Sequence, residues 1–87
     1  MRLDKFLKLT RLIKRRSVAK EIIEEGLIKI NGRVAKPANE IKIDDIIELK
    51  LGTHILTIKV KDVRDITTKE TANKLYEIIN DLVILPK

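Results

Sequence analysis

The sequence has no cysteine and no tryptophan, and its 87 residues include one histidine, one tyrosine, one phenylalanine, three glycines and two prolines. Without cysteine, disulfides and thiolate metal sites are excluded. The longest apolar run, Leu82–Leu85, is far too short to span a membrane, and the first ten residues lack the apolar core of a signal peptide. We therefore expect a cytoplasmic protein with no cofactor, no bound metal and no membrane segment.

The charge is unevenly distributed along the chain. Residues 1–36 contain eleven Lys and Arg against four Asp and Glu, a balance of +7, whereas residues 37–87 contain eight against nine, a balance of −1. Five of the six arginines lie in the first part. Arginine fits phosphate oxygens with two parallel hydrogen bonds, so a basic, arginine-rich half indicates a polyanionic partner more specifically than a high pI does.

Two short helices are predicted at the N-terminus. Apolar residues within Leu3–Leu7 follow the i, i+3, i+4 spacing of one helical face. A second helix is predicted over about Val18–Glu25, because Ser17 is a favourable N-cap and Gly26 suits the left-handed position that often follows a helix.

A small antiparallel sheet is predicted after the helices. Asn31-Gly32 lies between short apolar runs and is a strong signal for a two-residue hairpin, since both turn residues tolerate positive φ. Ile41 and Ile43 alternate with polar residues, as do the apolar residues of 47–51 and 56–60.

A C-terminal helix is predicted over about residues 68–81. Thr67 and Glu70 have the spacing of a capping box, and Tyr76 and Ile79 continue an apolar stripe. The apolar tail from Leu82 to Leu85 is expected to pack on the core. The fold class is therefore α+β in a single domain, 1–87, with two N-terminal helices, a small antiparallel sheet and a C-terminal helix.

The sequence contains few residues that could act in catalysis. His54 is the lone histidine and lies at a predicted turn, where an exposed side chain is the commoner situation. The adjacent carboxylates Asp44 and Asp45 have no partner histidine, so a solvated turn is favoured over acid–base work. Ser17 is better explained as a helix cap than as a nucleophile. We expect a protein that is not an enzyme.

The basic cluster RLIKRR at 11–16 is the strongest functional signal. If this segment turns tightly, Arg11, Lys14 and Arg15 share a face while Arg16 points towards the start of the second helix. Phe6 and Tyr76 occupy predicted core positions, so no aromatic platform for unpaired bases is available. Phosphates of folded RNA are therefore the favoured ligand, and Arg15 and Arg16 are expected to contribute little to the fold. The candidate RNA-binding residues are Arg2, Lys5, Lys8, Arg11, Lys14, Arg15, Arg16 and Lys20.

These residues also carry a family likeness. The stretch Gly26–Gly32 resembles the pattern G-x-[IV]-x-[IV]-N-G of the RNA-binding module first seen in small-subunit ribosomal protein S-four, the alpha-L motif, here over about residues 1–60. The segments MRLDKFLK, RLIKRR, AKE and ING, in this order, resemble the RqcP (YabO) family. Asp44-Asp45 stands where family members often have Gly-Asp.

The resemblance implies a factor that binds large ribosomal subunits blocked by peptidyl-tRNA. It implies contacts with rRNA and P-site tRNA, and help for a partner, RqcH, that adds a C-terminal alanine tail to the stalled chain. By the same resemblance, Arg2, Arg15 and Arg16 would be the main RNA contacts, with Lys5, Arg11 and Lys14 in support. We expect the protein to be a monomer.

Three alternatives remain open. The related fifteen-kilodalton heat-shock protein also recognises blocked large subunits but carries a longer basic C-terminal extension. In RNA-modifying enzymes the same module accompanies a catalytic domain, which is not evident here. A module that binds an acidic protein would also explain the charge, and its binding would survive RNase treatment.

Overall fold

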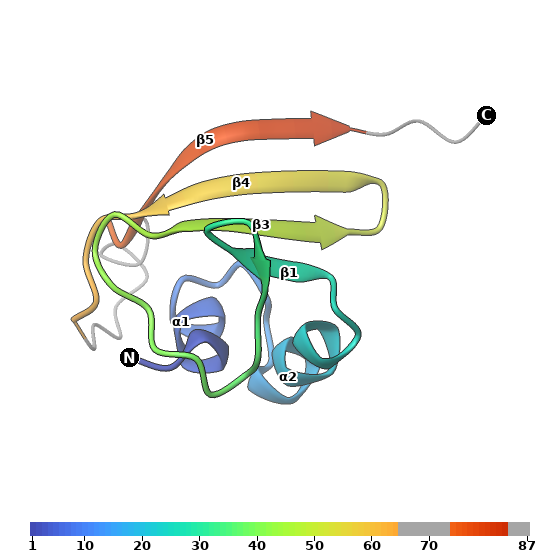
Figure 1. Cartoon of the computed structure of the whole chain (residues 1–87), viewed down its shortest axis with the longest axis horizontal. Helices are drawn as coiled ribbons and strands as arrows, with labels where there is room; N and C mark the ends of the chain where they lie inside the picture. Colours follow the sequence, from blue (N-terminus) through green and yellow to red (C-terminus); the bar gives the residue numbers. More distant parts are fainter. Residues whose placement is uncertain (65–73, 84–87) are drawn as a thin grey trace.

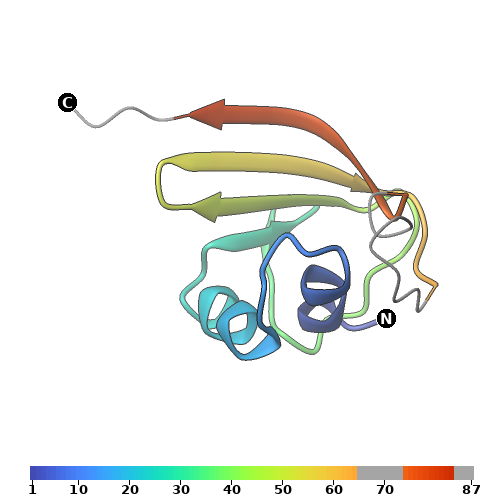
Figure 2. The ribbon, with the colours of Figure 1, turned by 180° about the vertical axis from the view of Figure 1, so that it is seen from behind.

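The computed structural model describes residues 1–64 and 74–83, in which two helices pack against one side of a five-stranded antiparallel sheet (Figures 1 and 2). The strand order is β2-β1-β3-β4-β5, so β5 forms the edge farthest from the helices. The α+β class and both N-terminal helices are thereby confirmed. The elements are α1 (Leu3–Leu9), α2 (Arg16–Glu24), β1 (Ile28–Ile30), β2 (Arg33–Val34), β3 (Ile46–Leu51), β4 (His54–Val60) and β5 (Tyr76–Val83).

The core lies between the helices and the sheet. The predicted apolar face of α1 is confirmed, because Leu3, Phe6 and Leu7 are fully buried. Ala19 and Ile23 of α2 are buried in the same cluster. With their apolar faces turned to the sheet, both helices leave their polar faces towards solvent.

Helix α2 begins earlier than the sequence predicts. It starts at Arg16, with Arg15 in extended conformation as its N-cap residue, so Ser17 lies inside the first turn and makes no capping hydrogen bond. The predicted cap at Ser17 is therefore wrong. A contact that the sequence does not reveal, between Arg16 and Asp4 of α1, involves the first residue of the helix. The predicted end is close, since Gly26 follows the helix with a φ of +80°.

The predicted hairpin is confirmed. Asn31 and Gly32 have φ values of 51° and 84°, and Ile30 pairs with Arg33 across the turn. The Asn31 side chain also accepts a hydrogen bond from the Ile46 backbone N–H at 2.9 Å, which ties the turn to β3.

The strand indicated by Ile41 and Ile43 does not form. Ile41 is buried but Ile43 is 55% exposed, and the chain turns instead at Asp44, whose φ is 75°. The Asp45 carboxylate closes this turn by accepting a hydrogen bond from the Lys42 backbone N–H at 2.8 Å. The solvated-turn interpretation of the Asp44-Asp45 pair thus describes its local structure.

The predicted C-terminal helix is wrong for residues 76–81, which belong to strand β5 and pair with β4 along its length. Without β5, strand β4 would be an exposed sheet edge with unpaired backbone groups, and covering that edge outweighs the helical periodicity of the segment. Leu75 is fully buried and Tyr76 packs against the core, as predicted. The beginning of the predicted helix, with its Thr67–Glu70 capping box, lies outside the described residues.

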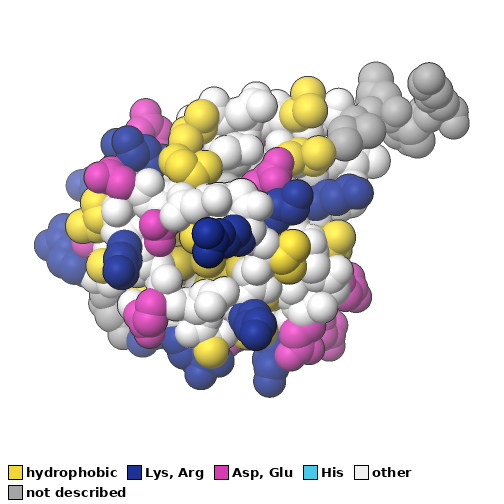
Figure 3. Space-filling model, viewed as in Figure 1, with side chains coloured by type: hydrophobic (Ala, Val, Ile, Leu, Met, Phe, Trp, Pro, Cys, Tyr) yellow, Lys and Arg dark blue, Asp and Glu magenta, His cyan; other side chains and the backbone are white. Residues whose placement is uncertain are grey.

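The apolar tail does not pack on the core where the structure describes it. Leu82 and Val83 are about half exposed, as are Ile78 and Ile79. Figure 3 shows apolar side chains at the surface along this side of the sheet. The expectation for Leu82 and Val83 is therefore wrong, and residues 84–87 lie outside the described part.

Candidate RNA-binding surface

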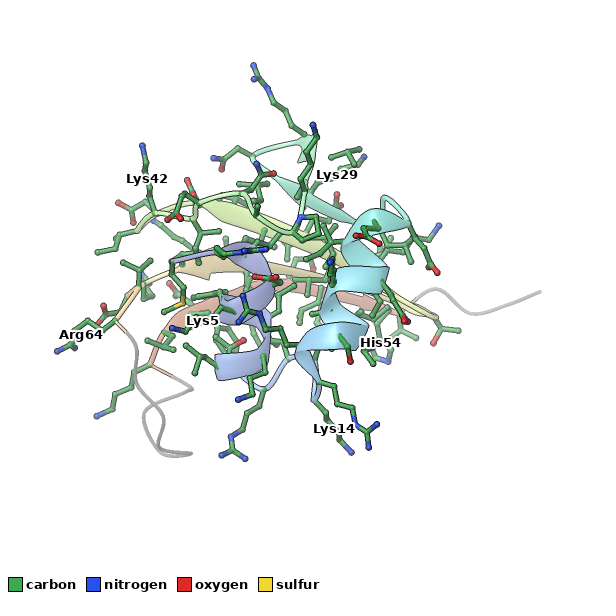
Figure 4. All side chains as sticks on the ribbon, turned by 90° about the horizontal axis from the view of Figure 1, so that it is seen from below. Lys5, Lys14, Lys29, Lys42, His54 and Arg64 are labelled. Carbon is green, nitrogen blue, oxygen red and sulfur yellow. The ribbon has the colours of Figure 1, made fainter. Side chains whose placement is uncertain are left out.

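The candidate cations form what we call the basic surface, built by α1, the connection 10–15 and the first turns of α2. Its members are Arg2, Lys5, Lys8, Arg11, Lys14, Arg15, Arg16 and Lys20. All of them are exposed except Lys5, which is half-buried. In Figure 4, Lys5 lies at α1 and Lys14 projects from the connection before α2, whereas Lys29 and Lys42 project from the opposite edge of the view.

Three of these cations meet at an open cavity. Lys8, Arg11 and Lys14 line it together with Leu9, and its volume is about 450 Å³. Because α1 ends at Leu9, the chain turns here and brings cations from the helix and from the connection to one place. Converging cations of this kind attract anions such as phosphate.

Arg11 adopts an unusual backbone conformation at this cavity. Its φ is 61°, the left-handed region that glycine usually occupies after a helix. For a residue with a side chain this conformation costs about 1–2 kcal/mol. A strained arginine where glycine would relieve the strain indicates that its side chain is kept for another purpose.

A second group gathers around Asp4, which is only 2% exposed. Arg2 donates a hydrogen bond to its Oδ2 at 3.2 Å, and Arg16 donates one to its Oδ1 at 3.5 Å. Lys20 lies one turn after Arg16 on α2 and so shares its helical face. Sequence reasoning missed Asp4, although it is the lone acid among the first twenty residues, which contain eight Lys and Arg.

Arg15 differs from Arg16 in having no such attachment. Within residues 1–64 and 74–83, its side chain forms no hydrogen bond or ion pair. Arg15 and Arg16 stand at the N-terminus of α2, which is the positive end of its dipole. No acidic residue lies in the first turn to offset their charge. This placement is mildly unfavourable for the helix and favourable for a bound anion.

His54 and the pair Asp62–Arg64 lie outside the basic surface, and each has a structural partner. His54 is exposed at the start of β4, where its Nδ1 lies 3.2 Å from Oδ1 of Asp81 on β5. Asp62 accepts a hydrogen bond from the Arg64 side chain at 2.6 Å, which lowers the pKa of Asp62. The described residues contain no cluster of three or more potential metal ligands, and none of their helices has the length and apolar character to cross a membrane.

Comparison with known proteins identifies the family and agrees with the fold. The model of the S4 domain family matches residues 1–47, and the solved structure of trimeric Heat Shock Protein 15 from Vibrio cholerae aligns with a TM-score of 0.83. That alignment has 34% identity and covers 90% of this chain and 80% of the other. Heat shock protein 15 of Escherichia coli is 34% identical over 65 residues, which span 75% of this chain and 49% of that protein.

Other relatives are more similar and match over nearly their whole length. The RQC P-site tRNA stabilizing factor of Streptococcus pneumoniae is 48% identical over 81 residues, covering 93% of this chain and 92% of the relative. The factor of the same name from Bacillus subtilis is 44% identical, with 93% and 94% covered. The chain therefore belongs to the S4 domain family and, within it, to the family of RQC P-site tRNA stabilizing factors.

Proposed function

We propose that this protein is a non-catalytic factor that binds large ribosomal subunits obstructed by peptidyl-tRNA, contacting rRNA and the P-site tRNA through the basic surface. The observation that carries the proposal is the 48% identity, over 93% of the chain, with a factor named for stabilizing P-site tRNA. The concentration of cations on α1, on the connection and on α2 supports it, because phosphate contacts supply most of the affinity of such proteins for RNA.

The resemblance to the RqcP family extends the proposal to a pathway. The protein acts in the cytoplasm as a monomer and supports the C-terminal alanine tailing of stalled nascent chains by an RqcH-like partner.

The two main alternatives are less well supported. A heat-shock-protein-15-like role would rest on 34% identity and on a match to about half of the E. coli protein. Binding of an acidic protein would explain the charge of the basic surface but not the family membership. It would also leave the interaction intact after RNase treatment.

We expect the affinity for large-subunit RNA to fall steeply with salt. Each phosphate that Arg or Lys neutralises releases condensed counterions, so about five contacts give a slope of roughly −3 to −5 in a plot of log K against log salt. Binding isotherms at four or five salt concentrations measure this slope. A nearly flat titration would instead favour apolar contacts.

Arg11→Gly is expected to separate stability from binding. Glycine relieves the strain at positive φ but is more flexible when unfolded, so the free energy of unfolding should rise by up to about 1 kcal/mol. The affinity for large subunits should fall, because the cavity loses one of its three cations. Chemical denaturation and a binding assay measure the two effects. Arg11→Asn is the control for charge loss with a side chain retained, and undiminished binding by Arg11→Gly would contradict the role of this cation.

A further inference from the structure

The carboxylate of Asp4 is buried within a surface that otherwise collects positive charge. Its side chain is 4% exposed, whereas those of its partners Arg2 and Arg16 are 47% and 49% exposed. Its Oδ1 also accepts a hydrogen bond from the Lys5 backbone N–H at 2.8 Å. The guanidinium group of each arginine is therefore bonded to Asp4, while about half of the arginine side chain remains exposed to solvent.

A carboxylate in the first turn of α1 is favourable for the helix dipole, but this does not explain why it is buried and bonded to two arginines. Buried ion pairs can often be replaced by apolar residues without loss of stability, because desolvation of the charges offsets their attraction. The neighbouring α1 residues Leu3, Phe6 and Leu7 are fully buried and already anchor the helix. Asp4 also removes one positive charge from a surface proposed to bind a polyanion, which by itself weakens binding.

Asp4 can compensate for this electrostatic cost by fixing the positions of two arginine side chains. Arg2 precedes α1 and Arg16 begins α2, so their side chains come from different elements and would otherwise sample many rotamers. A guanidinium group has five N–H donors, and a single bond to Asp4 leaves most of them available. Fixing the group in advance reduces the entropy lost when it binds a phosphate.

Building on the proposed function, we infer that Asp4 is a positioning residue. It holds Arg2 and Arg16 in one mutual arrangement, so that the pair recognises the phosphate geometry of folded RNA on the large subunit rather than negative charge in general. Asp4 does not itself contact RNA. Its contribution is selectivity, obtained at the expense of one unit of net charge.

The test compares two RNAs, of which only the structured one should lose affinity. Asp4→Asn keeps the shape of the side chain but weakens its hold on both arginines and raises the net charge by one. Affinity for large subunits carrying peptidyl-tRNA should fall by about ten- to one-hundred-fold, as when one or two charge-assisted bonds are weakened. Affinity for polyuridylate, an unstructured RNA, should stay the same or increase.

Two controls isolate the positioning effect. Glu77 lies on the distant strand β5, where its carboxylate forms an ion pair with Lys61 at 3.0 Å. Glu77→Gln makes the same change of net charge as Asp4→Asn, and this variant should bind obstructed subunits like the parent. In an Arg2→Ala/Arg16→Ala background, Asp4→Asn should cause no further loss, because a residue that acts through its partners has no effect without them.

Several outcomes would overturn the inference. Unchanged affinity of Asp4→Asn for obstructed subunits would do so, and so would an equal loss for both RNAs, which indicates a purely structural role. If the parent itself fails to bind large subunits, the proposed function fails instead. Should Asp4→Asn not fold, NMR of the parent decides: the guanidinium groups of Arg2 and Arg16 should rotate more slowly than that of Arg15, and equally fast rotation of all three contradicts the inference.

Discussion

Replacing Arg15 and Arg16 together by alanine is expected to lower the affinity for obstructed large subunits by about two to four orders of magnitude. The double variant loses two charge-assisted contacts, each of about 1.5–3 kcal/mol, and every 1.4 kcal/mol corresponds to a factor of ten. Lysine at both positions should restore only part of the affinity, since an ammonium group keeps the charge but cannot form two parallel hydrogen bonds to phosphate.

The two single variants should differ in stability. Sequence reasoning predicts that both arginines contribute little to the fold, and the structure changes this prediction for Arg16. Arg15→Ala should leave the melting temperature unchanged or slightly higher, because it removes a cation from the positive end of a helix dipole. Arg16→Ala should lower the free energy of unfolding by about 1 kcal/mol, because the buried carboxylate of Asp4 loses one of its two arginine partners.

Thermal melts and binding assays on the three alanine variants and the double-lysine variant measure both effects. The double-alanine variant must remain folded for the comparison. A melting temperature well above the assay temperature establishes that. If the folded double-alanine variant binds large subunits as tightly as the parent, these arginines are an ordinary solvated surface and the proposed interface is wrong.

Local sequence signals predicted the N-terminal half of the fold well, because they depend on short-range physics. The spacing of Leu3, Phe6 and Leu7 indicates the buried face of α1, and the pair Asn31-Gly32 indicates a turn whatever surrounds it. In contrast, the start of α2 involves a contact between residues twelve positions apart, Asp4 and Arg16, which no local pattern reveals.

The C-terminal element could not be predicted in the same way. Residues 76–81 have apolar positions compatible with a helix, but Ile78 and Ile79 are β-branched and favour a strand. The decision depends on β4, which offers an open edge along its whole length. Tertiary context of this kind routinely overrides local propensity, so the periodicity alone was misleading.

The basic surface was predictable as a set of residues but not as an arrangement. Charge segregation and the family likeness indicate the eight cations, yet they do not indicate that Lys8, Arg11 and Lys14 converge on one cavity. They also do not distinguish the unattached Arg15 from Arg16, which is attached to a buried acid. The first feature arises from the turn of the chain after α1, and the second from the contact between α1 and α2.

A factor of this kind should recognise a large subunit that carries peptidyl-tRNA. Sedimentation through a low-salt gradient tests this recognition directly, with purified protein added either to obstructed large subunits or to vacant ones. The double-alanine variant of Arg15 and Arg16 serves as the matched control in both gradients. Detection of the protein by immunoblot and of the tRNA by hybridisation shows which particles carry both.

We expect most of the parent protein to migrate with obstructed subunits, a smaller share with vacant subunits, and the double-alanine variant to remain mainly at the top of both gradients. A preference for obstructed subunits follows because only these offer tRNA phosphates in addition to those of rRNA. A parent protein that stays at the top of the low-salt gradient in the presence of obstructed subunits would contradict the account.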